Sequence, residues 1–195
     1  MSVVLRPRCA PQEIMHLTCA AAVAMCDAVE AAVGFRPGIK WTNDLVWDTR
    51  KLGGILTELG LSPKGIVDYA IIGIGINCNQ IESDFPEEIR SIATSLRTVT
   101  GKDIDRSRVA AAMVDALYRM DQDLLTRQEH IINRYRADCI TLGKEISLIK
   151  ADQVIRHGKA LSIDETGALI VSFEDGTTEI VNSGEVSVRG MYGYV

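Results

Sequence analysis

The segment that decides the fold spans residues 40–58 and reads KWTNDLVWDTRKLGGILTE. Thr42, Asn43 and Asp44 have turn chemistry and interrupt a short extended run, and a second turn follows at residues 48–50. Short extended runs separated by tight turns are typical of antiparallel hairpins. The segment therefore indicates short strands joined by a hairpin turn.

Two lysines in this segment, Lys40 and Lys51, lie eleven residues apart on either side of the hairpin, so their side chains could converge on one site. A strand-rich site with two ammonium groups suits a polyanion such as a triphosphate, or a carboxylate that a triphosphate activates. Gly53 and Gly54 leave bare backbone beside Lys51, which lets a ligand approach the main chain closely. A surface hairpin with solvated lysines explains these residues equally well.

A second motif, GIGIN at residues 73–77, ends an apolar strand predicted over residues 66–77. It lacks the third glycine of a dinucleotide-binding fingerprint and the Gly-Lys-Ser/Thr ending of a P-loop. A strand that ends in small residues and an amide could present Asn77 and backbone groups to a phosphate or a purine. A β-bulge or a strand crossing accounts for the motif equally well.

A third candidate is the pair Glu185 and Arg189, four residues apart on the last predicted strand. The two-residue period of a strand places both side chains on one face. They form either an exposed ion pair or a phosphate-binding arginine oriented by a carboxylate.

Composition limits the class of protein. The chain has 195 residues, 47% of them hydrophobic, and a net charge of −5, which is typical of a globular protein and does not indicate a nucleic-acid surface. The five cysteines lack metal-ligand spacing, so we expect buried thiols in a reducing compartment. A basic group at Arg127, Arg134 and Arg136 is expected to be a solvated helix face. We also expect a soluble, cytoplasmic chain without an apolar run long enough to span a membrane.

The spacing of apolar residues changes near residue 142, where we expect a domain boundary. Up to that point strands alternate with helices; after it, the pattern is all-strand with a spacing of about ten residues, which predicts a small barrel. The helices are expected at residues 11–33, 86–96 and 130–139, with another carrying Val109, Met113, Leu117, Met120 and Leu124. The strands are expected at residues 2–5, 39–41, 45–47, 52–59 and 66–77, and then at 145–150, 153–163, 168–173, 177–181 and 185–189.

Three motifs together resemble the biotin protein ligase family, in the right order along nearly the whole chain. The segment at residues 40–58 is similar to the family's KWPND…RKLxGIL signature, with Thr42 in place of proline; GIGINCN is similar to GxGIN; and SGEVSVRGMYGYV is similar to the GExSxR ending. The resemblance implies an α+β fold. Residues 1–142 would form a mixed sheet with helices packed on it, as in class II synthetases, and residues 143–195 an SH3-like β-barrel.

The resemblance also implies the chemistry, that of a biotin–[acetyl-CoA-carboxylase] ligase. The carboxylate of biotin, the substrate, attacks the α-phosphorus of Mg-ATP to give biotinyl-5′-AMP and pyrophosphate. A lysine of a biotin carboxyl carrier protein then attacks this mixed anhydride. The partners implied are that carrier and, as an open expectation, a second copy of the chain; the cofactors are ATP and Mg²⁺.

Residue roles follow from the resemblance position by position. Lys51 is expected to be the catalytic lysine, in contact with the biotin carboxylate and the α-phosphate, and Lys40 to add positive charge nearby. The remaining expected contacts are Asn43, Asn77, Gly75 and Ile76 for the nucleotide, Gly54 for biotin through its backbone, Glu185 and Arg189 for the triphosphate, and Asp44 for Mg²⁺.

The family's GRGRxGR loop, which closes over the adenylate, belongs upstream of residue 1, so we expect the catalytic unit to lack its N-terminal part. DNA binding would likewise require an upstream helix-turn-helix, as in some members. One alternative is therefore a fragment or non-catalytic form that binds biotin, nucleotide or a partner without turnover. Others are a lipoate protein ligase, which shares the general fold, and an SH3-like interaction domain with a helical prefix.

Overall fold

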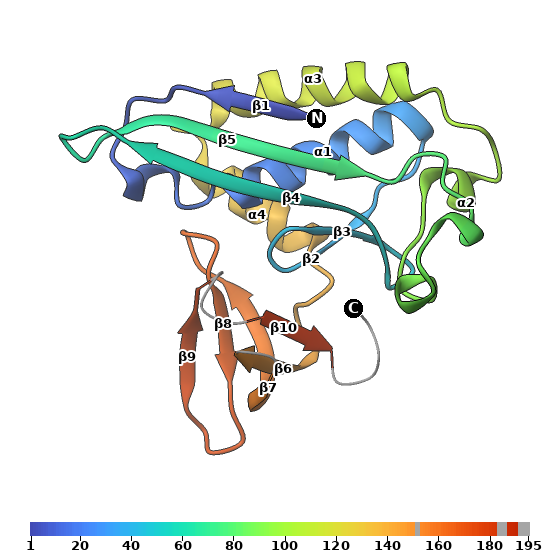
Figure 1. Cartoon of the computed structure of the whole chain (residues 1–195). Coiled ribbons are helices and arrows are strands. Elements are labelled where there is room, and N and C mark those ends of the chain that lie inside the picture. Colours follow the sequence, from blue (N-terminus) through green and yellow to red (C-terminus); the bar gives the residue numbers. More distant parts are fainter. Residues whose placement is uncertain (151–152, 183–186, 191–195) are drawn as a thin grey trace.

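A computed structural model describes residues 1–150, 153–182 and 187–190, the last four as backbone only. The described chain forms two five-stranded sheets, with the helices gathered beside the first (Figure 1). Strand order is β1-β5-β4-β3-β2 in the first sheet and β10-β6-β7-β8-β9 in the second. The α+β class is confirmed. The first sheet is antiparallel, and not mixed as expected, because neighbouring strands pair antiparallel in both sheets. Among the described residues, parallel pairing is limited to two isolated bridges, Ile39 with Cys139 and Lys51 with Ala93.

The elements follow the predicted order closely. The first sheet comprises β1 (Ser2–Leu5), β2 (Gly38–Lys40), β3 (Asp44–Trp47), β4 (Arg50–Leu61) and β5 (Val67–Ile76). The second comprises β6 (Glu145–Lys150), β7 (Gln153–Ile163), β8 (Leu169–Ser172), β9 (Thr178–Val181) and β10 (Ser187–Gly190). The helices are α1 (Leu17–Val33), α2 (Leu96–Thr100), α3 (Arg106–Asp123) and α4 (Gln128–Asp138), with 3-10 turns η1 (Pro11–Ile14), η2 (Glu82–Asp84) and η3 (Glu87–Ile89).

The hairpin between β3 and β4 closes in a two-residue turn. Trp47 pairs with Arg50, and the intervening Asp48 and Thr49 both have positive φ, 47° and 64°. Two consecutive left-handed residues define the type I′ turn, whose twist matches that of paired strands. The predicted hairpin turn is therefore confirmed, and it brings Lys51 opposite Val46 of β3.

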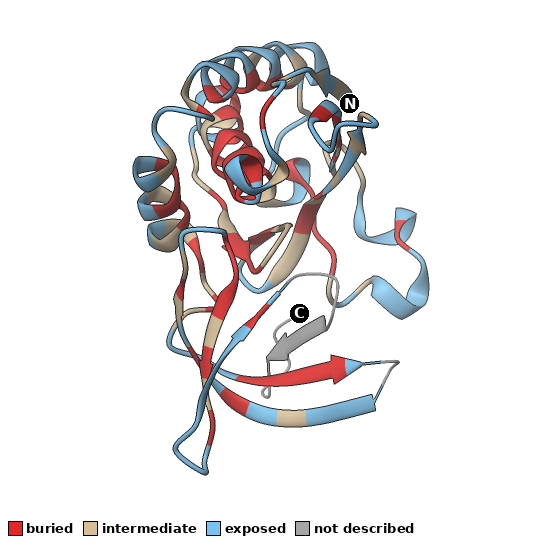
Figure 2. Cartoon of the chain, turned by 90° about the vertical axis from the view of Figure 1, so that its left-hand side faces the viewer, coloured by how far each residue is buried: buried red, intermediate tan, exposed pale blue. Residues whose placement is uncertain are grey.

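Helix α1 forms the centre of the core. It is apolar around most of its circumference, which is typical of a helix covered on every side. Figure 2 shows it enclosed as a buried element, and it packs between the first sheet and helices α3 and α4. It ends at Gly34, whose φ of 87° suits glycine.

One expectation about membranes needs correction. The segment Pro11–Val33 is long and apolar enough to cross a membrane, contrary to the expectation that no segment reaches that length. Within the fold, 72% of this segment's apolar window is buried. Its hydrophobicity is accounted for by packing inside the chain.

The helix predicted at residues 86–96 is wrong. Only the 3-10 turn η3 forms there, and α2 begins at its end, where Ser95 Oγ accepts the Thr98 amide hydrogen at 3.1 Å. Residues 92–94 instead lie along β4: Lys51 N donates to Ile92 O at 2.7 Å, and Thr94 N donates to Lys51 O at 2.8 Å. A pairing with a distant strand thus replaces the local helix.

The prediction that Arg127, Arg134 and Arg136 form a solvated helix face is partly wrong. Arg127 is exposed and pairs with Asp123, as a solvated face requires. Arg134, however, donates to Asp27 of α1 at 2.5 and 3.0 Å, and Arg136 donates to the backbone oxygen of Ile163. These two arginines join separate elements of the fold.

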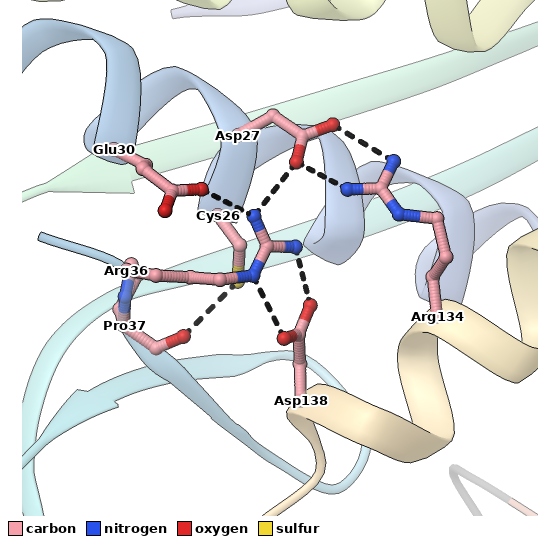
Figure 3. Close-up of polar contacts among 7 residues, drawn as sticks. All are labelled: Cys26, Asp27, Glu30, Arg36, Pro37, Arg134 and Asp138. Carbon is pink, nitrogen blue, oxygen red and sulfur yellow. Dashed lines mark hydrogen bonds and ion pairs between the residues drawn. The ribbon is translucent and has the colours of Figure 1, made fainter.

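Arg134 belongs to a charged cluster that fixes α4 to α1 (Figure 3). Arg36 reaches across it, donating to Asp138 at 2.8 and 2.5 Å and to Asp27 at 2.8 Å. Burial would raise the pKa of Asp27, but hydrogen bonds from Arg134 and Arg36 outweigh burial and lower it. The hydrogen bonds to Asp138 raise the pKa of the Arg36 guanidinium, so the cluster stays ionised.

The cysteines are mainly core residues. Cys9, Cys19, Cys26 and Cys139 are buried, and Cys78 is half-buried. Burial raises the thiol pKa values of Cys19 and Cys26, which keeps both thiols protonated at neutral pH. The prediction of buried thiols is confirmed at four of the five positions.

Candidate nucleotide and biotin site

The candidate site is a row of residues across four strands of the first sheet. Lys40 of β2 pairs with Asp44 of β3, Asp44 pairs with Gly54 of β4, and Gly54 pairs with Gly75 of β5. Directly paired residues project their side chains to the same face of a sheet. The register therefore aligns Lys40 and Asp44 with two glycines on one face.

This face is the one turned away from α1. Thr57 of β4 faces α1, because its Oγ1 lies 2.6 Å from Thr18 Oγ1. The two-residue period of a strand then directs Gly54, and Leu56 beside it, to the other face. Leu56 is exposed, as this geometry requires. The row lies on the open side of the sheet.

Lys51 joins the row through an ion pair. Its Nζ lies 2.6 Å from Asp44 Oδ1, and a Cβ built on Gly54 would lie 3.4 Å from Lys51 Cε and 3.4 Å from that same oxygen. The Lys51 side chain is 44% exposed and that of Asp44 16%. The ammonium is therefore held in place by one carboxylate and still accessible to a ligand.

The two lysines differ in environment. Lys40 is buried, with 8% of its surface exposed, whereas Lys51 opens to solvent. A cation in a less hydrated position acts more strongly on a nearby anion. The site thus combines one accessible and one enclosed ammonium group.

Gly54 and Gly75 leave the sheet surface beside these charges without side chains. A Cβ on Gly75 would meet nothing within 4 Å, so the space in front of the strand is open there. Gly53 has a different role, because its Cβ would lie 2.4 Å from Gly75 O. Gly53 lets the two strands approach, while Gly54 and Gly75 leave room for a ligand on the open face.

Asn43 is tied to β4. Its Nδ2 donates to Ile55 O at 2.7 Å, and its own backbone oxygen accepts the Ile55 amide hydrogen at 3.0 Å. The carboxamide nitrogen thus fixes the loop that follows Lys40. A direct contact between Asn43 and nucleotide remains a prediction.

Asn77 is tied to the segment that borders Lys51. Its Nδ2 donates to Thr94 O at 3.0 Å, and its backbone N donates to Leu52 O at 2.9 Å. Thr94 also donates its backbone N–H to Lys51 O. Asn77, Thr94 and Lys51 therefore form one connected unit, with the half-buried Ile76 preceding it.

The sequence interpretation missed residues 92–94 altogether. Ile92 and Thr94 fix the backbone of Lys51 on both sides, although they lie some forty residues further along the chain. The parallel bridge between Lys51 and Ala93 belongs to the same contact. Residues 86–96 were expected to form a helix, and no motif there indicates a contact with Lys51.

The last two predicted site residues are placed only partly. Glu185 lies outside the described residues. The backbone of Arg189 lies in β10, paired with Ser147 of β6. Their expected contact with a triphosphate stays a prediction.

The prediction of a metal ligand concerns Asp44. Within the described part of the chain, no three His, Cys, Asp or Glu side chains are grouped to hold a metal ion. Mg²⁺ is commonly bound by one or two carboxylates together with substrate phosphates. The single carboxylate of Asp44 would suit an Mg²⁺ ion that arrives bound to nucleotide phosphates.

Two family models and several known proteins are similar to this chain. Residues 1–77 match the Biotin/lipoate A/B protein ligase family, and residues 141–189 match the Biotin protein ligase C terminal domain. The bifunctional ligase/repressor BirA of Bacillus subtilis (strain 168) is 35% identical over 184 residues, which are 94% of this chain and 56% of that protein. The biotin--[acetyl-CoA-carboxylase] ligase of Paracoccus denitrificans is 30% identical over 193 residues, which are 97% of this chain and 79% of that protein.

The fold agrees as well. The biotin protein ligase from Aquifex aeolicus in complex with biotin and ATP superposes with a TM-score of 0.80 at 29% identity, over 97% of this chain and 77% of that one. The fold and the matched relatives place the chain in the biotin/lipoate protein ligase class. More narrowly, this chain belongs to the biotin protein ligase family. It spans little more than half the length of the BirA proteins that it matches.

Proposed function

We propose that this chain carries the activity of a biotin–[acetyl-CoA-carboxylase] ligase, activating biotin with ATP and transferring it to a lysine of a biotin carboxyl carrier protein. The observation that carries the proposal is the row on the open face, where Lys51 Nζ lies 2.6 Å from Asp44 Oδ1 in front of a glycine floor. An accessible ammonium group beside bare backbone suits two anions that must approach each other.

The first step joins the biotin carboxylate to the α-phosphate. A carboxylate oxygen attacks the α-phosphorus, the bond from that phosphorus to the bridging oxygen breaks, and pyrophosphate leaves. Lys51 would hold the carboxylate and the α-phosphate together, and Lys40 would add to the local positive potential. Negative charge accumulates as the anions meet, so fixed cations contribute most at this step.

The remaining contacts would orient the substrates. Gly54 would offer backbone groups to biotin, and Asn43, Gly75, Ile76 and Asn77 would form the nucleotide wall. Glu185 and Arg189 would reach the triphosphate from the C-terminal unit. Asp44 would bind Mg²⁺, which when present neutralises charge on the phosphates.

The second step transfers biotin. The ε-amine of the carrier lysine attacks the carbonyl carbon of biotinyl-5′-AMP, AMP leaves, and an amide bond forms. The open face gives such an acceptor access, since Gly75 and Leu56 are exposed there. We extend the proposal to a cytoplasmic protein with a boundary near residue 142, a catalytic unit at residues 1–142 and an SH3-like unit at residues 143–195.

Two features favour biotin over lipoate. The RKLGGIL segment at residues 50–56 resembles the motif of biotin protein ligases. Residues 141–189 match a domain named for biotin protein ligases. Incubation with lipoate in place of biotin tests this choice directly, because only the preferred acid should appear as an adenylate.

The test is transfer to an acceptor. The purified chain is incubated with Mg-ATP, biotin and a purified biotin carboxyl carrier domain, and intact-mass spectrometry follows the carrier. We expect one added biotinyl group per carrier, and none when the target lysine of the carrier is replaced by arginine. A folded chain that binds biotin and ATP but leaves the carrier unmodified would contradict the proposed activity and favour the non-catalytic alternative.

A further inference from the structure

The turn between β7 and β8 is held by donors from outside the C-terminal sheet. Arg136 of α4 donates to Ile163 O from Nε at 2.8 Å and from Nη2 at 2.6 Å. Gln128 Nε2 donates to Glu165 O at 2.8 Å, and Trp41 Nε1 donates to Gly167 O at 2.9 Å. Alternate carbonyl groups of one turn are thus each bound by a different side chain of the N-terminal unit.

The turn is itself well ordered by local contacts. Asp164 Oδ1 accepts hydrogen bonds from Thr166 N at 2.8 Å, Thr166 Oγ1 at 2.7 Å and Ala168 N at 2.9 Å. Gly167 has a φ of 92°, and a Cβ there would lie 2.7 Å from Cys19 Sγ of α1. The turn therefore offers the Gly167 carbonyl to Trp41 from a fixed position against α1.

Trp41 begins the loop that connects Lys40 to Asp44. Its backbone N donates to Thr141 Oγ1 at 2.9 Å, and the next residue, Thr42, accepts the Tyr135 hydroxyl hydrogen at its carbonyl, also at 2.9 Å. Trp41, Tyr135 and Thr141 are all buried. The loop is thus held from behind the sheet by groups on α4, the segment after it and the β7–β8 turn.

These contacts lie directly next to the site. Lys40 and Asp44, the residues at the two ends of the loop, belong to the row on the open face. A shift of the loop would move Lys40 and Asp44 relative to Gly54, and with Asp44 the ammonium of Lys51. Losing a buried hydrogen bond also leaves a carbonyl without a partner, which favours such a shift.

We propose that Trp41 is a positioning residue and that the β7–β8 turn, through the Gly167 carbonyl, sets the loop geometry needed for nucleotide affinity. The C-terminal unit would then influence the site in two ways: through the contact of the β7–β8 turn with Trp41 behind the sheet, and through Arg189. This inference rests on the proposed function only for its kinetic consequence; the mechanical coupling stands independently of it.

Two substitutions break the same contact from opposite sides. Trp41→Phe removes the indole N–H and keeps an aromatic ring, and Gly167→Ala pushes the turn away from Cys19. Gly176→Ala is the matched control, because Gly176 also has a positive φ, 80°, in the next turn of the same sheet, and a Cβ there meets nothing within 4 Å. It reproduces the backbone strain without touching the loop.

Steady-state kinetics of adenylate formation tests the kinetic consequence. We expect Trp41→Phe and Gly167→Ala each to raise the KM for ATP about tenfold, the effect of one lost buried hydrogen bond, while kcat changes little. The double variant should be no worse than Gly167→Ala, because both remove one interaction. An unchanged KM for ATP in both single variants would overturn the proposal.

Hydrogen exchange separates this inference from the proposed function. Amide exchange of residues 41–45 is followed by mass spectrometry in the three variants, which requires no activity. Faster exchange in Trp41→Phe and Gly167→Ala, but not in Gly176→Ala, supports the coupling even if the chain makes no adenylate. Equal exchange in all three variants overturns the coupling whatever the kinetics show.

Discussion

The ammonium nitrogen of Lys51 lies 2.6 Å from Oδ1 of Asp44, in front of Gly54 on the open face of the first sheet. The Lys51 side chain is 44% exposed, so solvent screens this pair and limits its contribution to stability to about 1 kcal/mol or less. The pair therefore matters more for placing a cation than for holding the fold together.

Asp44→Asn tests this distinction. We expect the free energy of unfolding to fall by less than about 1 kcal/mol, because the pair is solvent-screened. Adenylate formation should fall by at least about tenfold, because Lys51 loses the group that orients it. Urea denaturation and pyrophosphate release measure the two effects.

Asp48→Asn is the control for that change. It makes the same charge change in the exposed turn of the same hairpin, at a left-handed position that asparagine tolerates. It should leave both measurements unaltered. Full activity in Asp44→Asn would show that the ion pair does not position Lys51.

Substitutions of Gly75 and Gly53 are predicted to have opposite effects. Gly75→Ala adds a methyl group in open space, so stability should change by less than about 0.5 kcal/mol. The KM for ATP should rise about tenfold, because the methyl group occupies the floor of the site. Gly53→Ala should instead lower stability by about 1–3 kcal/mol, because its Cβ would lie 2.4 Å from Gly75 O. Thermal unfolding and kinetics of both variants would refute the assignment if the phenotypes were reversed.

Arg36 is predicted to be a major contributor to stability. Arg36→Ala leaves Asp27 and Asp138 half-buried with fewer partners, and should lower the free energy of unfolding by about 2–4 kcal/mol. Arg127→Ala removes only an exposed pair with Asp123 and should cost about 0.5 kcal/mol or less. Chemical denaturation compares the two, and equal losses would mean that the cluster in Figure 3 adds no more than a surface pair.

The same cluster predicts an acid dependence. The pKa of Asp27 is lowered in the folded state because hydrogen bonds from Arg134 and Arg36 outweigh its burial. A carboxyl group with a lowered pKa stabilises the fold above its ordinary pKa of 3.8, and that stability is lost as pH falls through the lower folded-state value. In the Asp27→Asn variant, the free energy of unfolding should therefore depend less on pH below about pH 3.8. An unchanged pH dependence would show that the ionised form of Asp27 does not contribute.

Much of the fold follows from local sequence. The β3–β4 turn was predictable because Asp48 and Thr49 separate two short apolar runs, and α3 was predictable because Val109, Met113, Leu117 and Met120 recur at helical spacing on its buried side. At this turn and in α3, neighbouring residues alone determine the structure. The pairing of Asp44 with Gly54 does not follow from the turn, because the register shifts between Leu45 and Val46.

Contacts between distant segments could not be predicted. Residues 92–94 leave the expected helix because their backbone groups pair with Lys51, and nothing near them in the sequence indicates that partner. Arg134 and Arg136 resemble solvated helix residues, and only the packing of α4 brings them to Asp27 and Ile163. The same limit applies to Trp41, whose indole partner lies 126 residues away.

The most direct test of the central claim is detection of biotinyl-5′-AMP by mass spectrometry after incubation of the purified chain with Mg-ATP and biotin. Lys51→Ala is the test variant and Lys64→Ala, in the exposed β4–β5 turn, is the control. We predict adenylate from the wild type and from Lys64→Ala, and a loss of about 10²–10³-fold in Lys51→Ala, the size expected for one preorganised electrostatic donor. Adenylate formed at a near-wild-type rate by Lys51→Ala would contradict the assignment of this row as the adenylation site.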